Sequence, residues 1–270
     1  MKCINKWICL SLLIAVSCVS GCGKTSAAIE QPYDVYATAA DFGLSSNGTA
    51  EAKSYFASDL CVSEDVAIGT DSTDSQVAEG AGTFNLETNT VVYAKNLYER
   101  LYPASTTKIL TAYIALKYCD DLDAMVTVSE NAVNQASDSS VCNLKAGDVI
   151  RLRDLLYGLM LRSGNDAAVA IAEYISGDVD SFAALMNQEA AAMGATRSHF
   201  VNPNGLPDEN HYTCVYDMYL IFSNAIKNDT FVSIIGTTSY DVTYTDASGE
   251  AVTHTWENTN QYLTGNATTP

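Results

Sequence analysis

The pattern of apolar and polar positions along the chain predicts several helices. Residues 105–118 form the clearest one, because Ile109, Leu110, Tyr113, Ile114 and Lys117 recur with helical spacing and trace one face. Residues 152–161 are strongly apolar, and after a break at 162–165 the pattern resumes over 166–175. Two further helices are expected over 180–193, ending before a glycine, and over 212–228.

Two stretches show strand patterns instead. Residues 80–95 predict two short strands around the turn at 87–89. Residues 238–244 and 250–256 predict a hairpin across the polar turn at 246–249. No internal repeat is present, and the length of 270 residues suits one sizeable domain with a leader and a tether.

The N-terminus predicts a secretory leader that ends in a lipid anchor. Lys2 and Lys6 precede an apolar run over 7–19, which is shorter than the ~20 residues of a membrane span. Small residues directly before Cys22 resemble the bacterial lipobox, in which that cysteine is lipidated. We therefore expect a signal peptide over 1–22, a tether over 23–60 and a protein held on the extracellular face of the cytoplasmic membrane; ordinary cleavage with an unmodified Cys22 is the alternative.

Charge and cysteine content remove several classes of function. The formal net charge of −18 argues against nucleic-acid binding and against electrostatic docking on anionic lipid. Cys61, Cys119, Cys142 and Cys214 follow no metal-binding or redox spacing; free or buried thiols are favoured, although disulfides remain open. The three histidines are scattered and no HExxH motif exists, so neither a metal nor another cofactor is expected.

The candidate chemistry begins at Ser105 and Lys108. Residues three apart on a helix share a face, so the hydroxyl and the amine can meet. A lysine acts as a base only when burial or a neighbouring cation lowers its pKa from ~10.4. Ser105 would then be an activated nucleophile for acyl transfer, but taken alone the pair fits a solvated helix start equally well.

A second element is Ser163-Gly164-Asn165, in the break between two apolar helices. The same Ser-x-Asn pattern occurs at Ser45, in the expected tether, and at Ser129, where a helix cap is expected. Ser163 could relay a proton to a leaving amine, and Asn165 could bind a substrate amide. The competing interpretation is that Ser163 caps the helix that follows.

Together these motifs resemble those of the serine-type D-alanyl-D-alanine carboxypeptidases, the low-molecular-weight penicillin-binding proteins. The resemblance covers about residues 60–270 and includes the stretches 102–108, 155–158, 163–168, 200–206, 211–213, 217–218 and 258–260. It implies an α+β fold like that of the β-lactamases and transpeptidases, with an antiparallel sheet flanked by helices. It also implies a catalytic domain over 61–270 that removes the terminal D-alanine from peptidoglycan stem peptides and is acylated by β-lactams.

In the roles that the resemblance implies, Ser105 is the nucleophile and Lys108 the general base. Ser163 shuttles the proton and Asn165 positions the substrate. The remaining possibilities are a catalytically impaired, lipid-anchored protein that binds the cell wall or β-lactams, and a hydrolase related to β-lactamases.

One motif of the family is missing from the chain. No Lys-Thr-Gly follows residues 258–260, and Thr264-Gly265 lacks the lysine. The resemblance implies that this lysine helps to lower the pKa of Lys108, and that its strand supplies an oxyanion-hole donor and belongs to the central sheet. We therefore expect the chain to be incomplete, with C-terminal strands missing, open edges on the strands at 80–95, and little turnover by the chain alone.

Overall fold

The structure is a computed structural model that describes residues 57–69 and 78–265. The description below concerns the unit Asp59–Pro270. The predicted signal peptide, Cys22 and all of the predicted tether before residue 57 lie outside the described residues. In the described part of the chain, no helix has both the length and the apolar character needed to cross a membrane.

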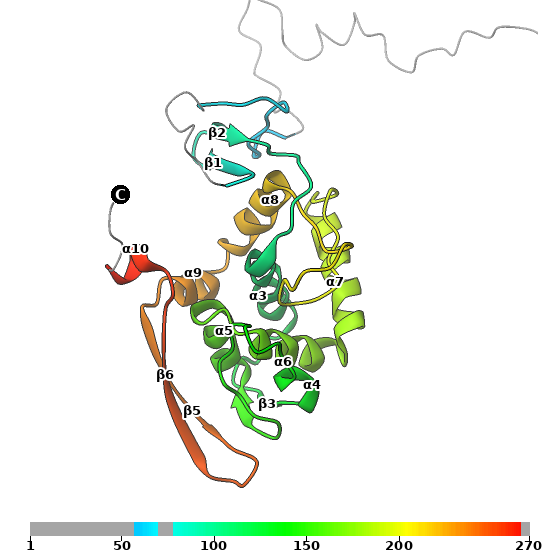
Figure 1. The fold of residues 1–270 in the computed structure, drawn as a ribbon. Coiled ribbons are helices and arrows are strands. Elements are labelled where there is room, and N and C mark those ends of the chain that lie inside the picture. The colour runs from blue at the N-terminus through cyan, green and yellow to red at the C-terminus, as the bar shows by residue number, and fades with distance from the viewer. Residues whose placement is uncertain (1–56, 70–77, 266–270) are drawn as a thin grey trace, which may run out of the picture. The chain divides into compact units, whose positions relative to one another are not determined.

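Helix α3 (Thr107–Tyr118) is the helix around which the others pack. A short 3-10 turn, η2 (Ala104–Thr106), leads into it. Figure 1 shows the surrounding helices, and α3 contacts α5 (Leu152–Leu161), α6 (Asn165–Ser176), α7 (Val179–Ala192), α8 (Val215–Ala225) and α9 (Asp229–Ile235). Two short helices, α4 (Glu130–Val133) and α10 (Gln261–Thr264), complete the described helical part.

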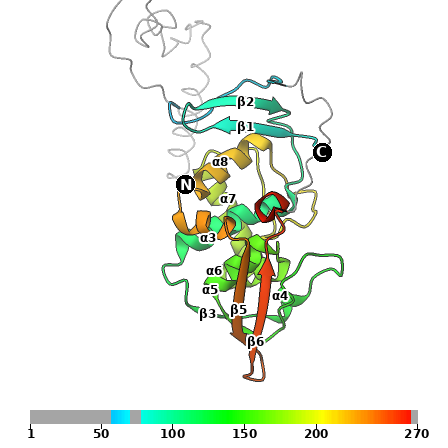
Figure 2. The same ribbon diagram turned by 90° about the vertical axis from the view of Figure 1, so that its left-hand side faces the viewer.

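The strands form two antiparallel sheets. Strands β1 (Ala81–Asn85) and β2 (Thr90–Lys95) pair with each other, and β2 receives one further bridge from Ile68 to Ala94. The second sheet has the order β3-β4-β5-β6 and consists of β3 (Met125–Thr127), β4 (Val149–Arg151), β5 (Ser239–Thr245) and β6 (Ala251–Glu257). Figure 2 shows β5 and β6 as a long hairpin. The predicted α+β class with antiparallel pairing is confirmed.

The predicted elements agree closely with the observed ones where the pattern was long. The strand pair at 80–95, the hairpin and α5 are all present. The prediction for 212–228 was too long: α8 begins at Val215, because Tyr212 and Thr213 form bridges with His199 and Leu101 instead. Lys117 was wrongly placed on the buried face of α3; its side chain is exposed and pairs with Glu189 at 2.6 Å.

Two apolar clusters hold these helices together. The larger one centres on α5 and α6, most of whose apolar side chains are buried, and the smaller one joins α3 to α7 and α8. Full burial of one such side chain contributes about 1.5–3 kcal/mol. The core residues that fix α3 in place are Leu110, Ile114, Phe182, Phe200 and Ile221.

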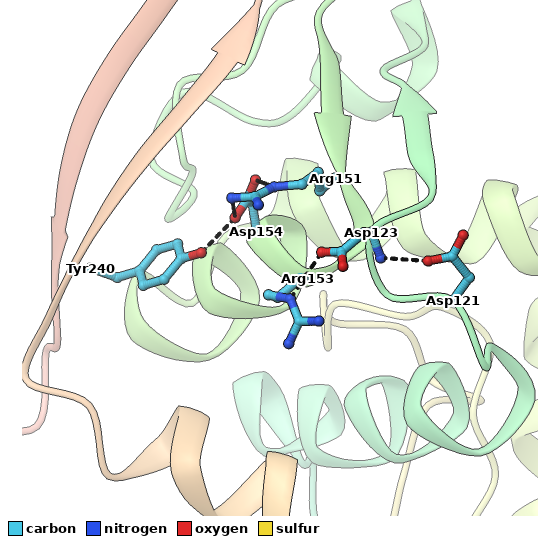
Figure 3. A network of polar contacts seen from close by, with 6 residues as sticks. All are labelled: Asp121, Asp123, Arg151, Arg153, Asp154 and Tyr240. Atoms are coloured by element: carbon cyan, nitrogen blue, oxygen red, sulfur yellow. Dashed lines mark hydrogen bonds and ion pairs between the residues drawn. The ribbon is translucent and has the colours of Figure 1, made fainter.

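A buried polar network connects the hairpin to α5 (Figure 3). The Asp154 carboxylate is fully buried, and the Arg151 guanidinium donates two hydrogen bonds to it at 2.8 and 2.9 Å. The Tyr240 hydroxyl of β5 donates a third at 2.6 Å, and its ring stacks on Tyr157. Asp154 thus accepts a hydrogen bond in each of these three contacts, as a buried carboxylate requires. The hairpin is therefore fixed to the helical core at its base.

Candidate active site

The 3-10 turn places Ser105 beside the first turn of α3. Ala104, with φ of 48°, bends the backbone so that the Ser105 side chain is exposed while Lys108 points inward. The Lys108 ammonium donates a hydrogen bond to Ser105 Oγ at 3.0 Å. The predicted pair therefore meets, and the alternative of a solvated helix start is wrong, because Lys108 is only 1% exposed.

Burial determines the charge of Lys108. Its Nζ has one further partner, the backbone carbonyl of Asn204 at 2.7 Å. Desolvation lowers the pKa of Lys108 to about 8, although the nearby Cys142 and Asp166 oppose the shift. At pH 7 about one molecule in ten then holds a neutral amine, against fewer than about one in a thousand for an exposed lysine. The neutral amine can accept the proton of Ser105.

Ser163 lies in the tight turn between α5 and α6 and faces Ser105. Its backbone has φ of 55°, and its Oγ donates to Ser105 Oγ at 2.9 Å. The N-cap of α6 is Gly164, and no side chain caps that helix. The capping interpretation of Ser163 is therefore wrong. Ser129, by contrast, does cap α4, because its Oγ accepts a hydrogen bond from the amide of Ala132.

Asn165 is the first residue of α6 and is only 5% exposed. Its backbone N–H donates to the carbonyl of Ser140 at 2.8 Å. Its side-chain amide makes no hydrogen bond to any residue that the structure describes, and an unsatisfied buried amide costs about 1–3 kcal/mol. A polar ligand group within reach of this side-chain amide would recover part of that cost.

His211 contacts the turn that carries Ser105 and Lys108, and no role was assigned to it from the sequence. Thr107 Oγ1 lies 2.9 Å from His211 Nε2, and His211 Nδ1 accepts a hydrogen bond from the Val201 amide at 3.1 Å. Because Nδ1 accepts, Nε2 carries the proton and donates to Thr107. Burial lowers the pKa of His211 to about 4, so the ring is neutral at physiological pH. His211 therefore holds the Ser105–Lys108 turn from behind.

Gly205 also packs against this turn, and it lies in the turn whose Asn204 carbonyl binds Lys108. Its φ is 86°, and a β-carbon at this position would lie 1.8 Å from the carbonyl oxygen of Ala104. Only glycine therefore allows the two turns to pack this closely. The Asn-Pro and Asn-Gly pairs within 202–205 were the available signal, since both dipeptides mark tight turns.

The described residues contain no cluster of potential metal ligands. Within 57–69 and 78–265, no three His, Cys, Asp or Glu side chains lie where they could hold a metal ion together. In the same part of the chain Cys61, Cys119, Cys142 and Cys214 are free thiols.

The profile of the D-alanyl-D-alanine carboxypeptidase family matches residues 69–269, and the chain belongs to this family. A D-alanyl-D-alanine carboxypeptidase of Streptomyces sp. (strain K15) is 37% identical over 196 residues, which are 69% of this chain and 67% of that protein. The carboxypeptidase DacF of Bacillus subtilis (strain 168) is 35% identical over 164 residues, 59% of this chain but only 42% of its own length. The chain thus spans less than half of the Bacillus relative.

Solved structures agree with the fold. The crystal structure of the Streptomyces K15 DD-transpeptidase has a TM-score of 0.64 at 35% identity and covers 69% of this chain and 74% of its own. The carboxypeptidase DacD of Francisella tularensis gives 0.63 at 27% identity, covering 75% of this chain and 60% of its own. The predicted transpeptidase-like fold is confirmed.

Replacing Gly205 tests the contact between the two turns. Gly177→Ala is the matched control, since Gly177 has φ of 87° and nothing lies within 4 Å of the added methyl. We expect the control to cost about 1–2 kcal/mol of unfolding free energy from backbone strain alone. Gly205→Ala should cost clearly more in urea denaturation, because the Ala104 carbonyl has to move. Equal costs would contradict the close packing.

His211 predicts a loss of stability in acid. Its folded-state pKa of about 4 lies below the ordinary 6.5, so the unfolded chain binds the proton first as pH falls. The stabilisation is complete above pH 6.5 and disappears toward pH 4, by about 3 kcal/mol in total. Urea denaturation at both ends of this range measures it. His211→Gln should remove this part of the pH dependence, and His254→Gln on the hairpin should keep it; identical profiles for all three proteins would refute the assignment.

Proposed function

We propose that this protein is a serine-type D-alanyl-D-alanine carboxypeptidase that removes the terminal D-alanine from peptidoglycan stem peptides. The observation that carries the proposal is the position of Ser105 Oγ, 3.0 Å from Lys108 Nζ and 2.9 Å from Ser163 Oγ. One hydroxyl thus has a base on one side and a proton relay on the other. Family membership supports the same reaction.

Acylation starts when neutral Lys108 takes the Ser105 proton. Ser105 Oγ then attacks the carbonyl carbon between the last two D-alanines and forms a tetrahedral intermediate. The Ser105 amide, in a first helical turn where N–H groups lack intrahelical partners, is placed to stabilise the oxyanion. The proton passes from Lys108 through Ser163 to the leaving nitrogen, the peptide bond breaks, and D-alanine departs.

Asn165 holds the substrate during this step. Its buried side-chain amide lacks a partner among the described residues and can hydrogen-bond the backbone amide of the stem peptide. Such a contact orients the scissile carbonyl over Ser105. Misplacing a reacting group by about 1 Å can cost on the order of 10²-fold in rate.

Deacylation completes the carboxypeptidase reaction. Water gives a proton to neutral Lys108 as it attacks the ester carbonyl on Ser105, the ester bond breaks, and Lys108 returns that proton to Ser105 Oγ. The Streptomyces relative carries the name DD-transpeptidase, and transfer of the same acyl group to an amine would be the corresponding reaction. Release of D-alanine with and without an added amine separates the two.

We also propose that Cys22 carries the lipid that attaches the protein to the membrane. The support is the sequence alone: a positively charged start, a short apolar run and small residues before the cysteine. Two or three acyl chains on one cysteine would give stable anchoring. The domain would then work at the membrane surface.

Labelling by a fluorescent penicillin tests the nucleophile. The protein should form a covalent adduct that Ser105→Ala abolishes and Ser163→Ala slows by on the order of 10²-fold. Ser129→Ala is the matched control, because Ser129 belongs to the same Ser-x-Asn pattern yet caps α4 and donates a hydrogen bond to Glu173. A label that survives in Ser105→Ala would end the proposal. D-alanine release from a synthetic stem peptide then reports turnover.

Metabolic labelling with radioactive palmitate tests the anchor. In a bacterial host the full-length protein should incorporate the label and sediment with membranes. Cys22→Ala should lose both properties, whereas Cys18→Ala, within the predicted apolar run, should lose neither. Membrane association without lipid incorporation would contradict the proposal.

A further inference from the structure

We propose that Asp166 is a positioning residue of this active site: it fastens residues 140–144 to the start of α6 and so fixes the turn that carries Ser163 and Asn165. Its carboxylate is 1% exposed and lies directly after Asn165. The inference rests on the proposed function, which assigns no role to this residue.

The contacts of Asp166 join two separate segments. Its Oδ1 accepts hydrogen bonds from the amides of Cys142 and Ala167, both at 2.9 Å. Its Oδ2 accepts from Cys142 at 3.0 Å and from Leu144 at 3.1 Å. In the opposite direction, the backbone N–H of Asn165 donates a hydrogen bond to the carbonyl of Ser140. The segment 140–144 is therefore held at the helix start from both sides.

This segment presses directly on the Ser163 turn. A β-carbon on Gly164 would lie 2.4 Å from the Cys142 sulfur, and one on Gly158 would lie 2.6 Å from it. The Cys142 side chain thus fills a slot that two glycines leave open, one at the end of the Ser163 turn and one on α5. If Asp166 no longer held the backbone amide of Cys142, the Cys142 sulfur would no longer be fixed against Gly164. The Ser163 turn could then shift.

The chemistry of the site requires a carboxylate rather than an amide. All four contacts come from N–H donors, so both oxygens act only as acceptors. An asparagine would point its NH₂ group at one of these donors and leave that donor unsatisfied, at a cost of about 1–3 kcal/mol. The position near the N-terminus of α6 also favours a negative charge.

The carboxylate has a second effect, on the charge of Lys108. Lys108 is faced by Ser105 Oγ and the Asn204 carbonyl, and by Asp166 and the Cys142 thiol, both of which favour its protonated form. Tyr244 on β5 and Arg162 at the end of α5 face the same cluster.

Removing the negative charge of Asp166 should therefore lower the pKa of Lys108 further. The two effects of the substitution are then opposite: the base loses its proton more readily, while the turn that uses it is displaced. A residue with a merely structural role would not change the titration of Lys108.

The experiment compares Asp166→Asn with Asp154→Asn. Asp154 is the matched control. Like Asp166 it is a buried carboxylate near the start of a helix, here α5, and it acts only as a hydrogen-bond acceptor (Figure 3). We expect the NMR titration of ¹³Cε-labelled Lys108 to move to lower pH in Asp166→Asn and to stay unchanged in Asp154→Asn. At pH values above the range in which Lys108 titrates, the rate of acylation by penicillin should fall by on the order of 10²-fold, and only in Asp166→Asn.

Asp166→Glu separates charge from position, and it provides a second variant if Asp166→Asn does not fold. It should keep the charge near Lys108 and still acylate slowly, because the longer side chain cannot keep all four contacts. Wild-type acylation by a folded Asp166 variant overturns the inference, as does an unchanged Lys108 titration in Asp166→Asn. If the wild-type protein is not acylated at all, the proposed function fails instead, and the titration, which needs no substrate, still decides the inference.

Discussion

The burial of one ammonium group is the constraint on which the rest of this structure depends. Lys108 is 1% exposed and has two polar partners, Ser105 Oγ and the carbonyl of Asn204. A buried cation with so few partners is costly, and the protein lowers the cost by lowering the pKa. The same desolvation that disfavours the ammonium therefore produces the neutral amine that a base requires. Burial of Lys108 therefore accounts both for its lowered pKa and for its ability to act as a base.

The surrounding elements shield Lys108 from solvent. Helix α3 lies among five others, so the first turn that bears Lys108 is covered. Gly205 lets the loop that supplies the Asn204 carbonyl approach Ala104, and His211 holds Thr107 from behind. The resemblance to the family implies that the lysine of a Lys-Thr-Gly motif also helps to lower this pKa. In the described residues, burial is already the largest cause of a shift to about 8.

The sequence allowed the long elements and the first pair of reacting groups to be predicted, because periodicity and spacing are local. Ser105 and Lys108 meet because a helix places residues three apart on one face. Ser163 needed context to be told apart from Ser129, and the structure confirms that only Ser129 is a cap. The roles of His211, Asp166 and the Asn204 carbonyl depend on contacts between segments distant in the chain, which no local pattern contains. The start of α8 was misplaced for the same reason, since the bridge from Tyr212 to His199 competes with the helix.

The most direct test is the pH dependence of Ser105 acylation by a penicillin, measured as a second-order rate constant from about pH 6 to pH 10. If a buried Lys108 is the base, the rate rises with pH with a midpoint of about 8 and reaches a plateau at higher pH. A midpoint at the ~10.4 of an exposed lysine, or a rate independent of pH, would show that burial of Lys108 does not generate the base.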